Sequence, residues 1–254
     1  MNYYIVTGAS RGIGAALVEA LLDPNHQVFG LSRGIDEELL AWADEKQTPL
    51  SWMQVDLAAG MDASHAMQVI LGKIDPEQAD RITLIHNAGV LDPIAAVGKG
   101  MDEESITRNI QVNLTAPMVM TNLFVETVQD WACEKQVLCI SSGAGKRPVH
   151  AWSAYCTAKA GLDMYCRCLA EEQEKEGQPI KVLSLAPGVV DTEMQSLIRS
   201  QSEEVFHNVQ RFLDLKAEEK LFSPQQVAGE IVKMLAEPEF GTPVLQDIRD
   251  RITQ

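Results

Sequence analysis

The sequence has few basic residues and few cysteines. Its 21 lysines and arginines stand against 36 aspartates and glutamates, so the formal net charge is −15. A surface this acidic repels phosphate, which argues against nucleic acid or an anionic membrane as a partner. The five cysteines include no C-x-x-C pair and no companion histidine pattern, so we expect reduced thiols of a cytoplasmic protein and no metal site.

Long apolar runs are also missing. No stretch is apolar over the length that a bilayer requires, and residues 1–6 lack the features of a signal peptide. With 46% hydrophobic residues among 254, the chain can still bury a substantial core, and we expect one domain over residues 1–254. Aromatic residues make up only 6%, so a pocket would be built largely from aliphatic and methionine side chains.

Short apolar segments alternate with longer segments of helical periodicity. Several of the short segments are apolar almost throughout, which is typical of parallel strands covered on both faces. We therefore expect an α/β fold with a doubly wound parallel sheet of the Rossmann type. The expected strands are residues 3–7, 27–31, 50–55, 82–86, 136–141, 181–186 and 242–245. The expected helices are residues 13–22, 37–45, 63–73, 116–131, 153–176 and one that begins at Pro224.

A polar, helix-prone segment follows the sixth expected strand, over residues 193–222. Ligands in doubly wound sheets bind beyond the carboxyl ends of the strands. This helical insertion is therefore expected to cover a ligand site as a lid. The alternative is a pair of helices that only packs on the outside.

A glycine-rich turn follows the first expected strand and opens the first helix. Glycines in such a turn let the backbone approach a pyrophosphate, whose charge is stabilised by free N–H groups and the helix dipole. The spacing is G-x-x-x-G-x-G, and the position after a first strand favours dinucleotide binding over a plain strand-to-helix turn. The turn reads Thr7-Gly8-Ala9-Ser10-Arg11-Gly12-Ile13-Gly14.

A carboxylate is missing at the end of the second expected strand. An acid there would accept hydrogen bonds from the ribose 2′-hydroxyl of NAD and would repel the 2′-phosphate of NADP. The chain has Leu31-Ser32-Arg33 instead, and Asp36 follows where it can simply begin the next helix. We predict that Arg11 and Arg33 clamp a 2′-phosphate beside the Ser32 hydroxyl, which favours NADP(H). The alternative is that both arginines are solvated.

Two further strand ends carry candidate cofactor residues. Asp56 and Leu57 follow the third strand, where they are placed to hold the adenine edge, although an acid there is also a common turn residue. Asn87, Ala88 and Gly89 follow the fourth strand, where small residues let the backbone run beside a cofactor; alone, they would also suit a plain turn.

Tyr155 and Lys159 lie four residues apart in a segment expected to be helical, so their side chains share one face. Hydride reduction of a carbonyl leaves an alkoxide that must be protonated, and tyrosine, with a pKa of ~10, is a poor acid at neutral pH. A nearby lysine cation lowers that pKa. Ser142 ends the fifth strand, where its hydroxyl is placed to orient the carbonyl. A Y-x-x-x-K pattern alone is common by chance.

These motifs match, in order and spacing, those of the short-chain dehydrogenase/reductase family, which the chain resembles over nearly its whole length. The resemblance implies hydride transfer from nicotinamide C4, with Tyr155 as proton donor and Lys159 also holding the nicotinamide ribose. It implies that Ser142 polarises the carbonyl and that Asn113 holds a proton-relaying water, although Asn113 also suits a helix N-cap. It also implies contacts to the nicotinamide end from Pro187, Gly188, Val190, Thr192 and Met194, with Gly188 also touching substrate.

The carboxyl-terminal third resembles the sepiapterin-reductase and bacterial benzil-reductase branches of that family. The glycine-rich final strand with Asp-Gly-Gly that many other members have is missing. The sepiapterin-reductase branch has a pterin-anchoring aspartate in this segment, and Asp247 lines up with it, so the resemblance implies that Asp247 binds substrate. A solvated terminal acid is the alternative, because the nearby Arg249 and Asp250 leave the alignment open.

The sequence therefore predicts an NADPH-dependent reductase of a ketone or vicinal diketone, benzil-like or sepiapterin-like. Two other hypotheses are an NAD-linked dehydrogenase of the same family and a non-catalytic NADP sensor. The missing acid after the second strand argues against the first, and the set Asn113, Ser142, Tyr155 and Lys159 argues against the second. The resemblance further implies a homodimer or homotetramer through the helices expected at 116–131 and 153–176.

Overall fold

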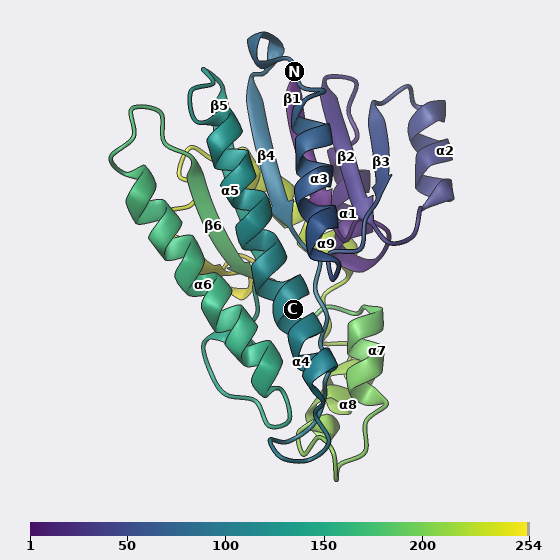
Figure 1. Cartoon of the computed structure of the whole chain (residues 1–254). Coiled ribbons are helices and arrows are strands. Elements are labelled where there is room, and N and C mark those ends of the chain that lie inside the picture. Colours follow the sequence, from purple (N-terminus) through teal and green to yellow (C-terminus); the bar gives the residue numbers. More distant parts are fainter. Residues whose placement is uncertain (253–254) are drawn as a thin grey trace.

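A seven-stranded parallel sheet, in the order β3-β2-β1-β4-β5-β6-β7, forms the centre of the computed structural model, which describes residues 1–252 (Figure 1). The strand order changes direction between β1 and β4, which is where sheets of this type bind ligands. The predicted doubly wound α/β fold is confirmed. The strands are β1 Asn2–Thr7, β2 His26–Ser32, β3 Leu50–Gln54, β4 Arg81–His86, β5 Glu134–Ile140, β6 Lys181–Ala186 and β7 Leu245–Asp247.

Helices cover both faces of the sheet. One layer consists of α3 (Gly60–Leu71), α5 (Ala116–Val128) and α6 (Ser153–Gln173), which stand in front of the strands in Figure 1. The other layer consists of α1 (Gly12–Leu21) and α9 (Pro224–Leu235), with α2 (Glu37–Glu45) at the β3 edge. No helix within residues 1–252 is both long and apolar enough to cross a membrane.

The alternation along β1 explains why the strands are apolar throughout. Tyr3 and Ile5 pack into the core under α3 and α5, while Tyr4 and Val6 pack into the core under α1 and α9. Successive residues of a strand point to opposite faces, so a strand with two covered faces needs apolar residues at every position.

The last strand differs from the prediction. Residues 242–245 were expected to pair, but β7 is Leu245–Asp247 and lies beside Ser184 to Ala186 of β6. Pro243 has no N–H to give to a ladder, and Gly241 holds a φ of +84° against the backbone of Val182. Pairing therefore begins only when the Ser184 N–H reaches the Val244 carbonyl, at 2.8 Å.

A helix that was not predicted precedes α5. Residues Glu103–Ile110 form α4, and a π-helical turn over Gln111–Thr115 joins it to α5 without a break in the backbone. Asn113 lies inside this turn, so the alternative interpretation, in which it caps a new helix, is wrong. Asp102, whose carboxylate accepts from the Ser105 N–H, is the N-cap of α4.

The insertion after β6 contains two helices, α7 (Glu193–Arg199) and α8 (Val209–Ala217), which lie beyond the carboxyl ends of the strands (Figure 1). A separate apolar cluster holds them to the body of the protein. Within it, the Phe206 ring stacks on Trp152 with centroids 5.1 Å apart, and Phe212 lies 5.8 Å from the same indole.

Candidate functional site

A cavity of about 660 Å³ opens at the carboxyl ends of the strands, under α7. The predicted cofactor residues and the predicted catalytic residues line the same cavity. Gly8 and Arg33 are among the first group, and Tyr155 and Lys159 are among the second. The predicted residues that line the cavity are Gly8, Ser10, Arg11, Gly12, Ile13, Ser32, Arg33, Asp56, Leu57, Asn87, Ala88, Gly89, Tyr155, Lys159, Pro187, Thr192 and Met194. Those that lie behind or beside the wall are Gly14, Asn113, Ser142, Gly188, Val190 and Asp247.

The glycine turn between β1 and α1 is packed too tightly for side chains. Gly8 has a φ of +67°, and a Cβ there would stand 2.8 Å from the Ala88 Cα. A Cβ on Gly14 would stand 2.0 Å from the Gly8 carbonyl oxygen, and one on Gly12 3.2 Å from Thr192. The first turn of α1 can therefore lie directly against the end of β4 only because these positions are glycine.

Asn87 joins this turn to the end of β4. Its side-chain amide donates to the carbonyl oxygens of Thr7 and Gly8, at 3.0 and 3.2 Å. In return, the Thr7 hydroxyl accepts from the N–H groups of Asn87 and Ala88, at 3.0 and 3.1 Å. These four bonds fix the two strand ends that border the cavity on either side of the change in strand order.

The end of β2 presents one cation and no carboxylate. Arg33 is exposed in the cavity wall and has no ion-pair partner within residues 1–252. Ser32 also lines the cavity, but its hydroxyl already donates to the Gly34 carbonyl and accepts from Trp52. Asp36 caps α2 by accepting from the Leu39 N–H at 3.0 Å, as its position in the sequence suggested.

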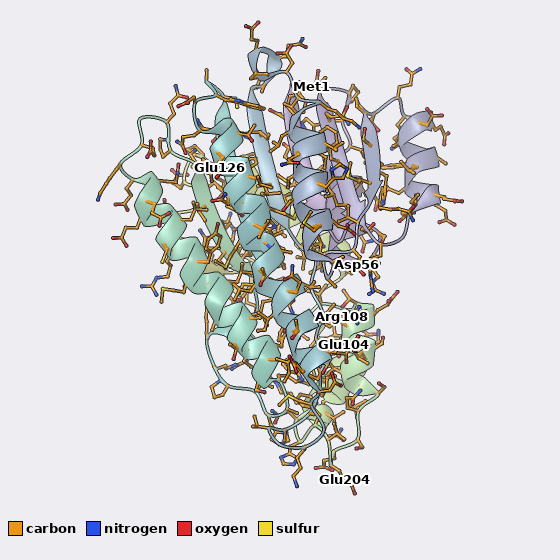
Figure 2. The ribbon with its side chains drawn as sticks, in the orientation of Figure 1. Met1, Asp56, Glu104, Arg108, Glu126 and Glu204 are labelled. Atoms are coloured by element: carbon orange, nitrogen blue, oxygen red, sulfur yellow. The ribbon has the colours of Figure 1, made fainter. Side chains whose placement is uncertain are left out.

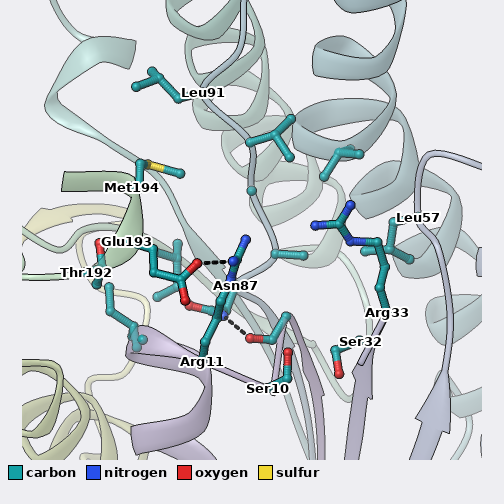
Figure 3. Close-up of a pocket in the computed structure, with 18 of the residues that line it drawn as sticks. Ser10, Arg11, Ser32, Arg33, Leu57, Asn87, Leu91, Thr192, Glu193 and Met194 are labelled. Carbon is teal, nitrogen blue, oxygen red and sulfur yellow. Dashed lines mark hydrogen bonds and ion pairs between the residues drawn. The ribbon is translucent and has the colours of Figure 1, made fainter. Parts of the chain in front are cut away.

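Arg11 does not face the cavity alone. Its guanidinium pairs with Glu193, the first residue of α7, while Arg33 extends on another side of the cavity (Figure 3). Both partners of the pair are mostly exposed, so it contributes at most about 1 kcal/mol to stability. Of the predicted two-arginine clamp, only Arg33 can accept an anion without giving up an existing partner.

Asp56 and Leu57 line the cavity where β3 ends. The Asp56 carboxylate also accepts from the Ala58 N–H at 3.0 Å, so it serves as a turn residue as well. Arg108 of α4 lines the same cavity and lies with Asp56 at the lower end of the sheet in Figure 2, while Glu204 marks the far tip of the insertion.

Tyr155 lies at the opposite end of the cavity, in the first turn of α6. Burial raises the pKa of Tyr155 to about 12, and a hydrogen bond with the Ser142 side chain opposes that rise. This direction is the reverse of the sequence-based expectation that Lys159 would lower the pKa of the phenol. Apolar surroundings penalise a phenolate, and the Lys159 ammonium donates to the Ile140 carbonyl at 2.8 Å. The phenol therefore keeps its proton at neutral pH.

Lys159 stands one turn further along the same face, with its Nζ 5.8 Å from the centroid of the Tyr155 ring. Burial lowers the pKa of Lys159 to about 8, which leaves the ammonium mostly charged at neutral pH. A Cβ on Gly89 would stand 3.8 Å from this Nζ and 3.1 Å from Oδ1 of Asn113. The ammonium and the amide thus flank the backbone that follows β4.

Asn113 is fully buried, and its side chain is committed to backbone contacts. Its Oδ1 accepts from the Val90 N–H at 3.1 Å, and its Nδ2 donates to the Val90 carbonyl at 2.8 Å. Nδ2 also reaches Asn109 of α4 at 3.0 Å. These bonds hold the segment after Gly89 against the π-helical turn.

The segment after β6 supplies Pro187, Thr192 and Met194 to the cavity wall. Gly188, with a φ of +75°, lies behind the wall, where a Cβ would stand 2.8 Å from the Phe222 ring. Val190 is buried in the core and pairs with Phe222 by a single bridge.

Asp247 lies at the end of β7, outside the cavity wall. Its carboxylate accepts two side-chain hydrogen bonds from Arg249, at 2.8 and 2.6 Å. This pairing holds the pKa of Asp247 below its usual range. The carboxylate is therefore occupied by a cation two residues further along the chain.

Several lining residues were not predicted from the sequence. Glu193 pairs with Arg11, which lies 182 positions away in the sequence, and no local sequence pattern predicts such a contact. Ser141 lines the cavity with a buried hydroxyl that has no partner in the described chain, and its position beside Ser142 was the available signal. The other lining residues that were not predicted are Leu31, Gly34, Val55, Val90, Leu91, Asp92, Arg108, Val112, Ile140 and Leu197.

Comparison with known proteins gives consistent relatives. A family model described as short chain dehydrogenase matches residues 2–203. A benzil reductase ((S)-benzoin forming) of Bacillus cereus is 39% identical over 240 residues, which cover 94% of this chain and 96% of that protein. A sepiapterin reductase of Meriones unguiculatus is 30% identical over 259 aligned positions, covering 97% and 95%.

A solved structure also matches the fold over most of the chain. The crystal structure of the KRED1-Pglu enzyme superposes with a TM-score of 0.80 at 29% sequence identity. The match covers 93% of this chain and 95% of that one.

Proposed function

This chain belongs to the short chain dehydrogenase family, and we propose that it is an NADPH-dependent reductase of ketones or vicinal diketones. Membership makes it an oxidoreductase that acts on CH–OH or C=O groups. The observation that carries the proposal is a cavity with two features: Arg33, which has no ion-pair partner among the described residues, at one end, and a protonated Tyr155 beside Lys159 at the other.

The wall of the cavity fits a dinucleotide. Side chains at Gly8, Gly12 and Gly14 would fill the turn where a pyrophosphate needs close backbone approach. Arg33 would bind a 2′-phosphate, and the nearest acid after β2, Asp36, is committed to capping α2. These features support NADP(H) over NAD(H).

The reaction divides between cofactor and protein. When bound, the reduced nicotinamide supplies the hydride that adds to the carbonyl carbon. The Tyr155 phenol donates its proton to the oxygen as that oxygen gains negative charge, and Ser142 orients the carbonyl from the side of the phenol. Lys159 would hold the nicotinamide ribose and keep a positive charge on the same helix face as the phenolate that remains. Asn113 keeps the backbone after Gly89 in place, and the family resemblance also assigns it a water that returns a proton to the site.

An apolar diketone suits the substrate end better than a pterin. Asp247, which the resemblance assigned to a pterin, is paired with Arg249 and lies outside the cavity wall. Leu91 and Met194 pack in the same apolar cluster as Tyr155, and Leu197 also lines the cavity. Benzil-like aryl diketones are therefore the substrates that we place first.

We also propose that the protein is a homodimer or homotetramer formed through α5 and α6. Both helices carry a methionine on their outer face, with Met118 40% and Met164 53% exposed. Exposed apolar side chains on adjacent helices are a feature of subunit interfaces.

The proposed function is tested by turnover of a small carbonyl panel with NADPH, followed as loss of nicotinamide absorbance. We expect benzil and a phenyl diketone to have a higher kcat/KM than sepiapterin or a simple aldehyde. Tyr155→Phe is expected to lower kcat by about 10²-fold or more, since it removes the proton donor, while NADPH still binds. Tyr165→Phe, on the same helix but outside the cavity wall, is the matched control and should stay active.

Three results would contradict the proposal. Retained activity in Tyr155→Phe would overturn the mechanism. Tight NADPH binding without turnover of any carbonyl would favour a non-catalytic sensor. Oxidation of an alcohol with NAD that outpaces NADPH-linked reduction would favour a dehydrogenase.

A further inference from the structure

A buried carboxylate lies one helical turn beyond Lys159. Asp163 follows Lys159 by four residues on α6, so the two side chains share a face of the helix. Both are buried, with 7% of Asp163 and 4% of Lys159 exposed. Burying a charge is costly unless it is paired or hydrogen-bonded, and the reaction described above makes no use of Asp163.

Three parts of the fold meet at this carboxylate. The Ser184 hydroxyl of β6 donates to Oδ1 at 2.7 Å, which stabilises the ionised form. Oδ2 faces Gly145, where a Cβ would stand 2.8 Å away. Gly145 ends the short turn that Ser142 caps. Asp163 therefore lies where α6, β6 and the Ser142 turn come together.

Lys159 has few groups to stabilise its charge. Within the described chain, its Nζ donates one hydrogen bond, to the Ile140 carbonyl. Burial lowers its pKa, and the acids that oppose this effect are Cys139, Asp163 and Cys166. Thiols are mainly neutral at pH 7, whereas an aspartate is ionised. Among these three acids, Asp163 is the carboxylic acid and the other two are thiols.

The other titratable groups around Lys159 supply no negative charge. His86 at the end of β4 is buried, and burial together with Lys159 lowers its pKa to about 3, so it is neutral. The Tyr155 phenol, with a pKa of about 12, is neutral as well. His86 on β4 and Tyr155 in the first turn of α6 are therefore neutral neighbours of the ammonium, and the neighbouring carboxyl group is that of Asp163, one turn further along α6.

We propose that Asp163 is a positioning residue for the carbonyl reduction, acting as the buried counter-charge that keeps Lys159 in its ammonium form. The inference rests on the proposed function, because it serves the role that Lys159 has there. Asp163 also holds α6 against β6 and the Ser142 turn, so one side chain aligns the segments that carry Tyr155, Lys159 and Ser142.

The test compares pH profiles of kcat and of NADPH binding for wild type and Asp163→Asn. As the pH rises through the pKa of Lys159, the ammonium loses its proton and both quantities fall. Removing the carboxylate should shift this alkaline limb to lower pH by about one unit, which lowers kcat at pH 8 roughly five-fold. A purely structural role would lower kcat without moving the limb.

Two further variants complete the test. Asp44→Asn makes the same Asp-to-Asn change at an exposed position on α2. Its pH profiles of kcat and NADPH binding should keep the wild-type alkaline limb. If thermal unfolding shows that Asp163→Asn does not fold, Asp163→Ser offers a smaller neutral side chain with a hydroxyl for Ser184. A folded neutral variant with an unmoved limb overturns the inference.

Failure of the proposed function gives a different result. In that case the wild type binds NADPH but reduces no carbonyl. The pH dependence of NADPH binding, which also needs a charged Lys159, still decides the role of Asp163.

Discussion

Tyr155 and Lys159 show burial acting in opposite directions on an acid and a base. Because burial penalises whichever form is charged, the pKa of the phenol rises to about 12 and that of the ammonium falls to about 8. The pair still suits proton donation at neutral pH, since the phenol holds a proton and the ammonium is mostly charged. On this basis, the loss of reductase activity at alkaline pH should follow deprotonation of Lys159 rather than of Tyr155.

Arg33 gives the residue-scale prediction for the cofactor. Arg33→Asp replaces the guanidinium in the cavity wall with a carboxylate that repels a 2′-phosphate and accepts hydrogen bonds from a ribose hydroxyl. Loss of charge-assisted hydrogen bonds should lower the NADPH-to-NADH ratio of kcat/KM by about 10²-fold or more. Steady-state kinetics with both cofactors measure this ratio.

Arg147→Asp is the matched control, because it makes the same charge change at an exposed residue outside the cavity wall. Its ratio should stay near that of the wild type. If Arg33→Asp also kept the wild-type ratio, the assignment of NADP(H) through Arg33 would be wrong.

At the scale of elements, two helical glycines should respond to alanine with opposite sign. Gly14 in α1 and Gly229 in α9 both lie inside helices, where alanine is favoured by about 1 kcal/mol. A Cβ at Gly14 meets the Gly8 carbonyl at 2.0 Å, while a Cβ at Gly229 meets nothing within 4 Å. Gly229→Ala should raise the free energy of unfolding by about 0.5–1 kcal/mol, and Gly14→Ala should lower it by at least about 2 kcal/mol.

Urea unfolding measures both changes, and NADPH binding should weaken only in Gly14→Ala. A stable Gly14→Ala protein with normal NADPH affinity would show that the tight contact between α1 and the end of β4 is not required. The Gly229→Ala protein, with the same change in composition, serves as the control for helix propensity.

The sequence predicted elements where the signal is local. The first six strands and most helices follow from periodicity, and the glycine turn follows from its position after β1. By contrast, α4 and the π-helical turn depend on Asn113 binding Val90 and Asn109, which no helical pattern encodes. The start of β7 depends on Gly241 packing against Val182, a contact between distant segments. Asp163 did have a local signal, since Tyr155, Lys159 and Asp163 repeat every four residues.

At the scale of the whole molecule, the insertion and the start of α6 meet through a small aromatic cluster. Phe206 is fully buried and stacks on Trp152, which in turn stands edge-on to Tyr155 with centroids 5.9 Å apart. The sequence predicted the insertion as a lid, and Met194 and Leu197 of α7 do line the cavity. How the lid is fastened was not predictable, because Phe206 reaches Trp152 from a segment with no periodicity.

The aromatic cluster leads to the last prediction, for Phe206→Ala. Removing the stacked ring opens a void beside Trp152 and loosens the insertion where α7 borders the cavity, while the glycine turn and Arg33 are untouched. We expect the KM for a diketone to rise about ten-fold with little change in the Kd of NADPH, since substrate positioning weakens while the cofactor contacts at the glycine turn and Arg33 stay. Leu213→Ala, on α8 but 39% exposed, is the control and should leave both values unchanged. Equal weakening of diketone and NADPH binding in Phe206→Ala would show that the insertion holds the whole cavity, so that the cluster is a general support rather than a substrate lid.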